Sequence, residues 1–559
     1  MANHPTAPVL GNQYLGDRVL QAWLDRALPP SMRSAIHDDL DALGAQAAQA
    51  WSEARSSRRH QPELTPFDAW GGRVDRIETT PVWQRGAAIA ARYGLVAAGH
   101  EPTYAEFARC NQFARVYLQH VASEFYTCPL AMTDGAATAL KASGNQQLIE
   151  RALPRLTSRD PATLWLSGQW MTELTGGSDV GDSETEAQPV GDGQYSLHGR
   201  KWFTSAVIGE MALTLARPQG AAAGGDGLAL FYLETRDEGG QWNGIRIDRL
   251  KDKLGTRELP TAEIHLDGTL ATPVSGLDHG VRMITPVLNV TRIWNAVCAL
   301  ATMRRCIALA TSYAHQREAF GRRLIDHPLH ATTLADMQVE FEAAFQLVFH
   351  VSHLLGRSEC ALANANERAL LRLLTPLAKL WTGKLAVRIA SETCEAFGGA
   401  GYIEDTGIPQ LLRDAQVYPI WEGTTNVLAL DSLRAIASVG VEPLLDTADA
   451  LLAEILKSRA SASLEAHAMS VCSAIKQASQ WLHRNAANAD AMQAGARDLA
   501  FTLARSMAAA LLCRQAAYSI KETGDMRPSQ ALARFIGAGL VSLPDAGGPH
   551  PLDLLDPPH

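Results

Sequence analysis

The chain has 559 residues, a formal net charge of −9 and a pI of about 6.0, so the molecule as a whole has no electrostatic attraction for nucleic acid or anionic lipid. Hydrophobic residues make up 47% and charged residues 19%, which excludes a disordered or fibrous chain and predicts roughly three to four compact units. The eight cysteines form no CxxC pair, no secretory leader pattern opens the chain and no run of 18 apolar residues occurs, so we expect a cytoplasmic protein without a metal site or a membrane partner.

Four segments of different texture follow one another, and only the second is rich in β-branched and aromatic residues. Their order predicts an α+β fold that is mostly α. The predicted units are an N-terminal helical domain (1–162), a middle antiparallel β-barrel (163–276), a C-terminal helical bundle (277–437) and a helical appendix (438–559). No GxGxxG motif follows a predicted strand, which disfavours a Rossmann domain.

Helical spacing of Ala, Leu and Ile predicts the helices, and short segments between Gly and Asp turns predict the strands. A Pro- and Gly-rich segment after Leu543 is expected to be disordered. In chain order, the expected elements are helices at 82–98 and 136–153, strands between 163 and 268, and helices at 281–315, 332–355, 367–395 and after Asn426.

Two segments in the predicted barrel have side chains suited to a polar ligand. In QWMTELTGGSDV (169–180), a turn with Thr172, two glycines and Ser178 exposes N–H groups and hydroxyls that can bond a polar ring edge or a phosphate. In KWFTSA, Trp202 and Thr204 are two residues apart and are expected on one face of a strand. A plain Gly turn and a core tryptophan are the alternatives.

A lone carboxylate occurs in YPIWEGTTN (418–426). Glu422 follows apolar residues and precedes the flexible Gly423. Apolar surroundings raise the pKa of a carboxyl group and make it a stronger base. Thr424 and Asn426 stand at the start of a predicted helix, where caps and bound anions occur. A helix N-cap with a nearby acid is the alternative.

A fourth motif, HQREAFG (315–321), places Arg317 in the last turn of the long helix, where a favourable contact with the helix dipole is the alternative explanation. A fifth, FGGAGY (397–402), is a Gly-rich break between helices. In order and spacing, the five motifs resemble the acyl-CoA dehydrogenases. RLKDKLGTRE (249–258) and the long appendix are most similar to the alkylation-response (AidB-like) branch.

The resemblance implies FAD as cofactor and assigns a role to each matching position. Glu422 matches the catalytic base and Arg292 the arginine next to it. Thr291 stands where some family members carry the base, and Ser178, Thr291, Arg292 and Gly423 are the implied substrate contacts. Implied FAD contacts are Trp170, Met171, Thr172, Ser178, Trp202, Thr204, Thr424 and Asn426, with Arg317, Phe320, Gly398 and Gly399 directed to the FAD of a neighbouring subunit.

Two positions depart from the family pattern on the adenine side of FAD. Glu395 replaces a glutamine before the Gly-rich break, and Pro328 stands where a glutamine that touches FAD is common. Both weaken the adenine-side contacts that the resemblance implies, but neither concerns the flavin ring or the base.

The implied function is α,β-dehydrogenation of an acyl-CoA in fatty acid metabolism, with Glu422 taking the Cα proton and flavin N5 taking the hydride. A homotetramer and an acceptor like the electron-transfer flavoprotein are expected partners. Two alternatives remain: a flavin-containing DNA-binding alkylation-response protein, and an acyl oxidase or monooxygenase. From Val441 to His559 the appendix carries ten cations against twelve acids, a net charge of −2, which disfavours DNA binding.

Overall fold

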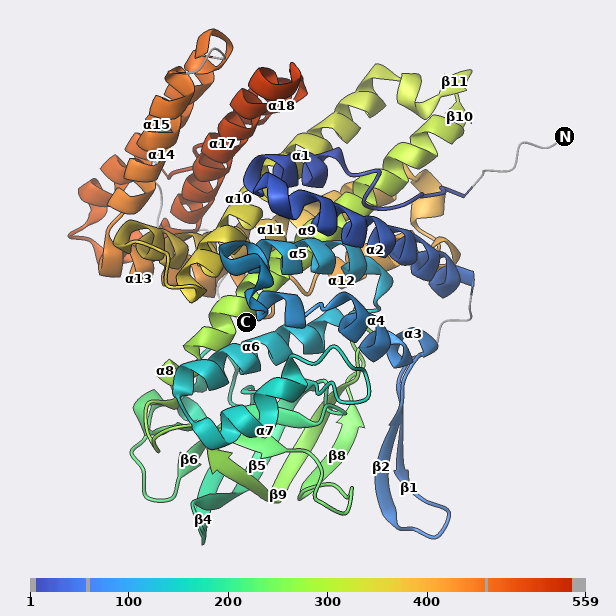
Figure 1. The fold of residues 1–559 in the computed structure, drawn as a ribbon, viewed down its shortest axis with the longest axis vertical. Helices are drawn as coiled ribbons and strands as arrows, with labels where there is room; N and C mark the ends of the chain where they lie inside the picture. Colours follow the sequence, from blue (N-terminus) through green and yellow to red (C-terminus); the bar gives the residue numbers. More distant parts are fainter. Residues whose placement is uncertain (1–6, 57–60, 458–460, 545–559) are drawn as a thin grey trace, which may run out of the picture.

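The computed structural model describes residues 7–56, 61–457 and 461–544. The β-barrel lies at one end of a helical body, and the last helices form a separate layer at the other end (Figure 1). The predicted fold class, α+β and mostly α, is confirmed. Most of the segment after Leu543 that we expect to be disordered lies outside the described residues.

The N-terminal part is helical with one β-hairpin. Its elements are α1 (Arg18–Ala27), α2 (Pro30–Ser56), β1 (Glu63–Phe67), β2 (Arg73–Glu78), α3 (Pro81–Gln84), α4 (Gly86–Tyr93), α5 (Ala108–Gln119), α6 (Thr127–Ser143) and α7 (Gln146–Leu156), with 3₁₀ turns at Ala97–Gly99, Pro102–Phe107 and His120–Ala122.

Two helices predicted as continuous are broken at glycines. The predicted helix 82–98 is α3, α4 and a 3₁₀ turn, because Gly94 ends α4 with φ +60°. The predicted helix 136–153 is parts of α6 and α7, because Gly144 ends α6 with φ +67°. A glycine adopts this left-handed conformation at low cost, so both residues terminate helices by a standard C-cap.

The hairpin β1–β2 was not predicted from the helical texture of this region. It extends beside the barrel (Figure 1), and its Leu64 and Ile77 pack against the barrel core. The Asp75 carboxylate accepts a hydrogen bond of 3.0 Å from the N–H of Ile247 in the barrel. The hairpin therefore fastens the N-terminal helices to the barrel.

The middle part is a closed barrel. Its strands are β3 (Ser167–Trp170), β4 (Glu186–Gly191), β5 (Gln194–Ser205), β6 (Met211–Pro218), β7 (Ala229–Glu234), β8 (Ile245–Leu250) and β9 (Thr261–Pro273). The ring runs β6–β4–β5–β9–β7 and closes through a β6–β7 pairing, with β3 on β6 and β8 on β9. The purely antiparallel expectation is wrong for two pairs, because β6 runs parallel to both β3 and β4. Long connections through other strands make these parallel pairings accessible.

The C-terminal bundle surrounds one buried helix. Its elements are α8 (Gly280–Met283), α9 (Thr285–Gln316), β10 (Glu318–Ala319), β11 (Arg322–Arg323), α10 (Pro328–Glu359), α11 (Ala365–Ala396), α12 (Ile408–Ala415) and α13 (Thr425–Val439), with 3₁₀ turns at Leu324–Asp326, Gly398–Gly401 and Glu404–Thr406. Among the described residues, α9 alone is long and apolar enough to cross a membrane, yet 89% of its most apolar window is buried in the protein. That burial is typical of a core helix.

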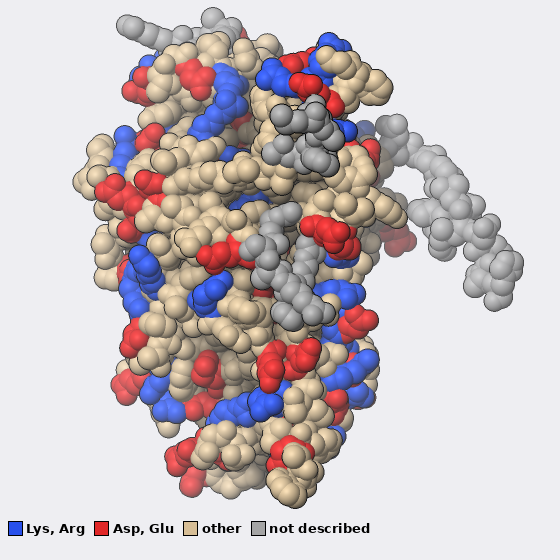
Figure 2. Space-filling model, turned by 90° about the vertical axis from the view of Figure 1, so that its right-hand side faces the viewer, with Lys and Arg blue, Asp and Glu red and all other residues tan. Residues whose placement is uncertain are grey.

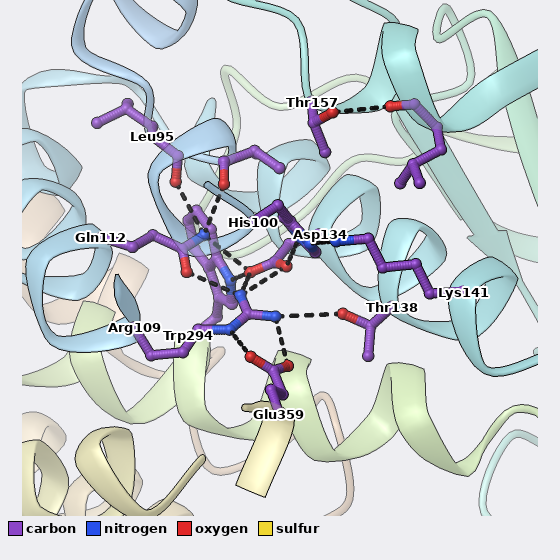
Figure 3. Close-up of polar contacts among 12 residues, drawn as sticks. Leu95, His100, Arg109, Gln112, Asp134, Thr138, Lys141, Thr157, Trp294 and Glu359 are labelled. Atoms are coloured by element: carbon purple, nitrogen blue, oxygen red, sulfur yellow. Dashed lines mark hydrogen bonds and ion pairs between the residues drawn. The ribbon is translucent and has the colours of Figure 1, made fainter. Parts of the chain in front are cut away.

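A buried polar network joins the N-terminal helices to this bundle (Figure 3). Arg109 on α5 donates to Asp134 on α6 at 2.7 Å and to Glu359 at the end of α10 at 2.6 Å. The indole N–H of Trp294 on α9 donates to the same Asp134 at 2.7 Å. Burial opposes the charge of Asp134, but Arg109 and His100 hold its pKa well below its usual range. The network fixes α9 against α6 three residues after Thr291.

The appendix consists of α14 (Glu442–Leu456), α15 (Ser461–Asn485), α16 (Ala489–Ala494), α17 (Ala496–Thr523) and α18 (Arg527–Gly537). Three of its arginines bind acids on one helix of the bundle, α10. The pairs are Arg505–Glu340 at 2.7 Å, Arg527–Glu342 at 2.5 Å and Arg534–Asp336 at 2.6 Å. These cations therefore dock the appendix on the body.

Candidate active site

The loop between α12 and α13, which we call the Glu422 loop (residues 416–424), is held in an unusual conformation. Glu422 has φ +55° and Gly423 has φ +98°. A non-glycine residue in the left-handed region costs on the order of 1–3 kcal/mol and persists only where its surroundings hold it. Helix α9 supplies one of those contacts, because the indole N–H of Trp421 donates to the Asn295 side chain.

The Glu422 carboxylate faces Thr291 on α9. The Thr291 hydroxyl donates to Glu422 Oε2 at 2.5 Å, and Thr291 is 2% exposed. Burial raises the pKa of Glu422 above its ordinary value, and the Thr291 hydrogen bond with the nearby charges of Lys379 and Arg292 limits the rise. A raised pKa makes this carboxylate a stronger base than an ordinary glutamate, and the Thr291 hydroxyl and the two cations favour its ionised form.

Arg292 contacts the backbone rather than the carboxylate of Glu422. Its Nε lies 3.4 Å from the Glu422 carbonyl oxygen, and its Nη1 donates to Asp431 on α13 at 2.8 Å. Asp431 also accepts from Arg372 on α11 at 2.8 Å. Burial raises the pKa of Asp431, but the bonds from both arginines bring it below the ordinary value. The sequence did not indicate Asp431, since an Asp inside an amphipathic helix has no distinctive pattern.

Lys379 on α11 is a second residue that the motifs did not reveal. It is 0% exposed, and its Nζ donates to the carbonyl oxygens of Trp421 and Gly423 at 2.5 Å each. Burial is the main cause that lowers the pKa of Lys379 to about 7. Its position inside the apolar stretch LLTPLAKLW could have indicated a buried lysine with a specific partner, because a lysine is rarely buried without one.

The two barrel segments predicted to bind flavin are joined directly. The N–H of Trp202 on β5 donates to the Thr172 carbonyl at 2.9 Å. Met171 is buried, Thr172 is partly exposed and Ser178 is exposed on the following turn. A Cβ at Gly177 would lie 2.6 Å from the Thr172 hydroxyl, so glycine is needed for this loop to pass close to Thr172.

For Trp170 the predicted FAD contact stays a prediction, and the structure restricts how it could be made. Its side chain is 0% exposed and belongs to the barrel core, so a contact with a ligand outside the barrel is limited to its backbone. Beneath the loop, Lys201 donates to Glu173 at 2.6 Å, and both are buried. This ion pair anchors the Thr172 turn, and the sequence does not indicate it, because its two residues lie 28 positions apart and meet only in the folded barrel.

Thr204 and Trp202 differ in accessibility because the β5–β9 register shifts between Lys201 and Thr204. Thr204 is 0% exposed and its hydroxyl donates to the Ala262 carbonyl at 2.7 Å, so a hydrogen bond to flavin N5 stays a prediction. Trp202 is partly exposed, and Lys251 Nζ lies 3.1 Å from its ring centroid.

Cys128 on α6 links the two halves of the site. Its thiol lies within hydrogen-bonding reach of Ser205, at the end of β5. The negative charge of Glu422 is close enough to raise the pKa of the thiol. Burial is the main cause that raises the pKa of this thiol to about 12. The structure thus brings Glu422, Thr291 and the end of the KWFTS segment around one place.

The residues predicted to contact the FAD of a neighbouring subunit lie at the C-terminal end of α9, away from Glu422. Helix α9 ends at Gln316, so Arg317 is not in its last turn but in extended conformation at its C-cap. Phe320, with φ +51° at the tip of the β10–β11 hairpin, is 97% exposed. Gly398 and Gly399 are at the same end of α9, since Phe397 stacks on Tyr313 with ring centroids 4.4 Å apart.

The remaining predicted positions lie at helix ends. Thr424 is the N-cap of α13, where its hydroxyl accepts from the N–H of Val427 at 3.4 Å, and Asn426 is exposed in the first turn. Of the two departures from the family pattern, Pro328 opens α10 and Glu395 is exposed near the end of α11. Proline suits the first helical position, because that N–H has no partner in the helix.

Comparisons with known proteins agree with this arrangement. Four family models match in chain order: "Adaptive response protein AidB N-terminal domain" at 3–161, "Acyl-CoA dehydrogenase, middle domain" at 168–269, "Acyl-CoA dehydrogenase, C-terminal domain" at 278–437, and "Acyl-CoA dehydrogenase 11 C-terminal domain-like" at 447–543. The chain belongs to the acyl-CoA dehydrogenase family.

Individual relatives extend over most of the chain. It is 43% identical to acyl-CoA dehydrogenase family member 11 of Caenorhabditis elegans, over 92% of this chain and 86% of that protein. It is 33% identical to the putative acyl-CoA dehydrogenase AidB of Escherichia coli, over 74% and 76%. The structure of C. elegans ACDH-11 in complex with C11-CoA superposes with a TM-score of 0.93 at 40% identity, covering 97% of this chain and 94% of that one.

The residues present fit the FAD that the family uses. A surface suited to a flat ring with polar edges is formed by the Thr172 and Ser178 hydroxyls, the partly exposed Trp202 and the close passage of the backbone at Gly177.

No group of three or more His, Cys, Asp or Glu side chains that could hold a metal occurs in the part of the chain that the structure describes.

Proposed function

We propose that the protein is an FAD-dependent acyl-CoA dehydrogenase in which Glu422 is the catalytic base. The observation that carries this proposal is the Glu422 carboxylate, whose pKa is raised by burial while Thr291 donates to it at 2.5 Å. The relative ACDH-11 was solved with C11-CoA, which supports an acyl thioester as substrate.

The protein's own groups set up the removal of the Cα proton. Glu422 receives the proton, and the Thr291 hydroxyl orients the carboxylate beforehand and favours its ionised form. Lys379 and Arg292 approach the carbonyl oxygens of residues 421–423, while no backbone partner of the Glu422 N–H occurs among the described residues. That N–H is therefore free to bond the thioester oxygen, and such a donor contributes about 10²–10³-fold. FAD, when bound, supplies the acceptor for the Cβ hydride.

The length of α9 supports a site that is shared between subunits. Thr291 and Arg317 are 26 positions apart in the sequence, which corresponds to about 39 Å along a helix. Arg317 therefore cannot serve the FAD beside Thr291 of its own subunit. We propose a homotetramer in which Arg317 and the exposed Phe320 contact a neighbour's FAD, with the Arg317 guanidinium suited to the pyrophosphate.

DNA binding as the main activity is disfavoured by the docking of the appendix. Arg505, Arg527 and Arg534 are paired with acids of α10, so they are not free to neutralise phosphates. The face of the molecule in Figure 2 shows basic and acidic side chains interspersed. We propose instead that the appendix stabilises the dehydrogenase body.

We further propose a cytoplasmic location, a role in fatty acid metabolism, and an electron acceptor similar to the electron-transfer flavoprotein. The name of one relative, the caffeyl-CoA reductase–Etf complex subunit CarC of Acetobacterium woodii, 28% identical over 57% of this chain, supports such an acceptor. An acyl oxidase or monooxygenase is the alternative chemistry.

The experiment is anaerobic titration of the FAD-bound protein with a panel of acyl-CoAs of different chain length. A dehydrogenase bleaches the flavin and forms an enoyl-CoA without consuming oxygen. Rapid oxygen uptake by the reduced protein in air would instead favour the oxidase. Absence of bleaching with every acyl-CoA would refute the proposal.

A further inference from the structure

Lys379 donates hydrogen bonds to two backbone carbonyls of the Glu422 loop. It projects from the middle of α11 and is completely buried. Its two hydrogen bonds, each 2.5 Å, go to the carbonyls immediately before and after Glu422. One ammonium group thus spans the residue that carries the base.

The geometry of the peptide bond turns this hold into control of a donor. The carbonyl of Trp421 and the N–H of Glu422 belong to the same peptide unit, and in a trans peptide these groups point in opposite directions. The chain has no cis peptide bond among its described residues. When Lys379 holds the Trp421 carbonyl toward α11, the Glu422 N–H therefore points away from α11.

The same contacts stabilise a backbone conformation that the chain would otherwise avoid. Glu422 has φ +55° and Gly423 has φ +98°. Glycine tolerates this region, but a glutamate does so only when its surroundings enforce it. Lys379 therefore fixes the peptide plane between Trp421 and Glu422 and the plane between Gly423 and Thr424, while Arg292 Nε lies 3.4 Å from the carbonyl of the plane between them.

Lys379 also acts on the carboxylate through its charge. The groups that face Glu422 are Arg292 and Thr291 from α9, Cys128 from α6 and Lys379 from α11. Of these, Thr291 through its hydrogen bond, and Lys379 and Arg292 through their charges, favour the ionised carboxylate. Losing the ammonium therefore moves the ionisation of Glu422 to higher pH.

We propose that Lys379 is a positioning residue that aims the Glu422 N–H at the thioester oxygen and keeps the adjacent carboxylate in place. The inference rests on the proposed dehydrogenase function. In this proposal Lys379 acts through the backbone of the Glu422 loop, from the α11 side, and not by contact with the substrate or the flavin. The loop conformation, and not the packing of α11 alone, is what this lysine maintains.

Two substitutions separate its hydrogen bonds from its charge. Lys379→Met removes both donors and the charge, whereas Lys379→Gln removes the charge but keeps two N–H donors on a side chain one bond shorter. Lys384→Met is the matched control, because Lys384 is exposed on the same helix. All are compared as FAD-bound full-length proteins.

The measurements are the limiting rate of anaerobic flavin reduction by acyl-CoA across pH, and amide hydrogen exchange in residues 417–424. We expect Lys379→Met to reduce the limiting rate by about 10²-fold, the effect of a lost oxyanion donor, and to speed exchange in the loop. Lys379→Gln should lose less. In both variants the fall in rate at low pH should begin at a higher pH than in the wild type.

Equal limiting rates and equal loop exchange in Lys379→Met and Lys384→Met would overturn the proposal. If Lys379→Met does not fold, Lys379→Gln decides, and an acid limb at the wild-type position counts against the role. If no acyl-CoA reduces the wild-type flavin, the proposed function fails, and the exchange measurement alone then tests Lys379.

Discussion

Replacing Thr291 by valine removes one hydroxyl from the catalytic base and changes little else. The Thr291 hydroxyl is the donor of the 2.5 Å bond to Glu422, and valine has nearly the same volume as threonine. A hydrogen bond to a charged group is worth about 1.5–3 kcal/mol, and one pKa unit corresponds to about 1.4 kcal/mol. The bond favours the ionised carboxylate, so its loss should raise the pKa of Glu422 by about 1–2 units.

The assay is the rate of anaerobic flavin reduction by saturating acyl-CoA as a function of pH. Because the base must be ionised, the rate falls as the pH drops through the pKa of Glu422. In Thr291→Val this acid limb should lie about 1–2 pH units higher, and the rates should converge at pH values well above it. Thr285→Val, at an exposed position of the same helix, is the control. An acid limb at the same pH in both variants would refute the assignment of Thr291 as the partner of the base.

Three further predictions concern the rest of the molecule. Arg317→Ala should weaken FAD retention and leave folding intact, measured by flavin content after gel filtration; a monomer by light scattering that keeps its FAD would contradict the shared site. Arg505→Met removes one partner of an ion pair whose Glu340 side chain is 5% exposed, so we expect a loss of about 3 kcal/mol in unfolding free energy, with exposed Arg484→Met as the control and equal melting temperatures as the opposing result. Duplex DNA should bind only weakly at physiological salt; sub-micromolar affinity that is lost on deleting the appendix would reverse our view of that domain.

The sequence indicated the mostly helical chain with a β-rich middle, and it singled out Glu422 and its neighbours, because the chemistry of those motifs is local. The role of Glu422 as the base stays a prediction. Glu422, Thr291 and Arg292 do lie together, and Trp202 bonds the Thr172 carbonyl. The breaks at Gly94 and Gly144 were missed because helical periodicity continues on both sides of them. Both glycines were visible signals for a C-cap.

The support of the site could not be predicted in the same way. Lys379 and Asp431 contact the motif residues only after α9, α11 and α13 have packed, since they lie 43 and 9 positions from Glu422 in the sequence. The Lys201–Glu173 pair likewise spans 28 residues. Such contacts depend on tertiary structure, although a charged residue within an apolar stretch indicates that a buried partner exists.

The most direct test of the catalytic assignment is the Glu422→Gln variant, which keeps the shape of the side chain and removes the base. With FAD bound at the wild-type level, anaerobic mixing with the best acyl-CoA substrate should bleach the flavin at least about 10²-fold more slowly than in the wild type, the low end for loss of a general base. Bleaching of Glu422→Gln at the wild-type rate would contradict the assignment and place the base elsewhere.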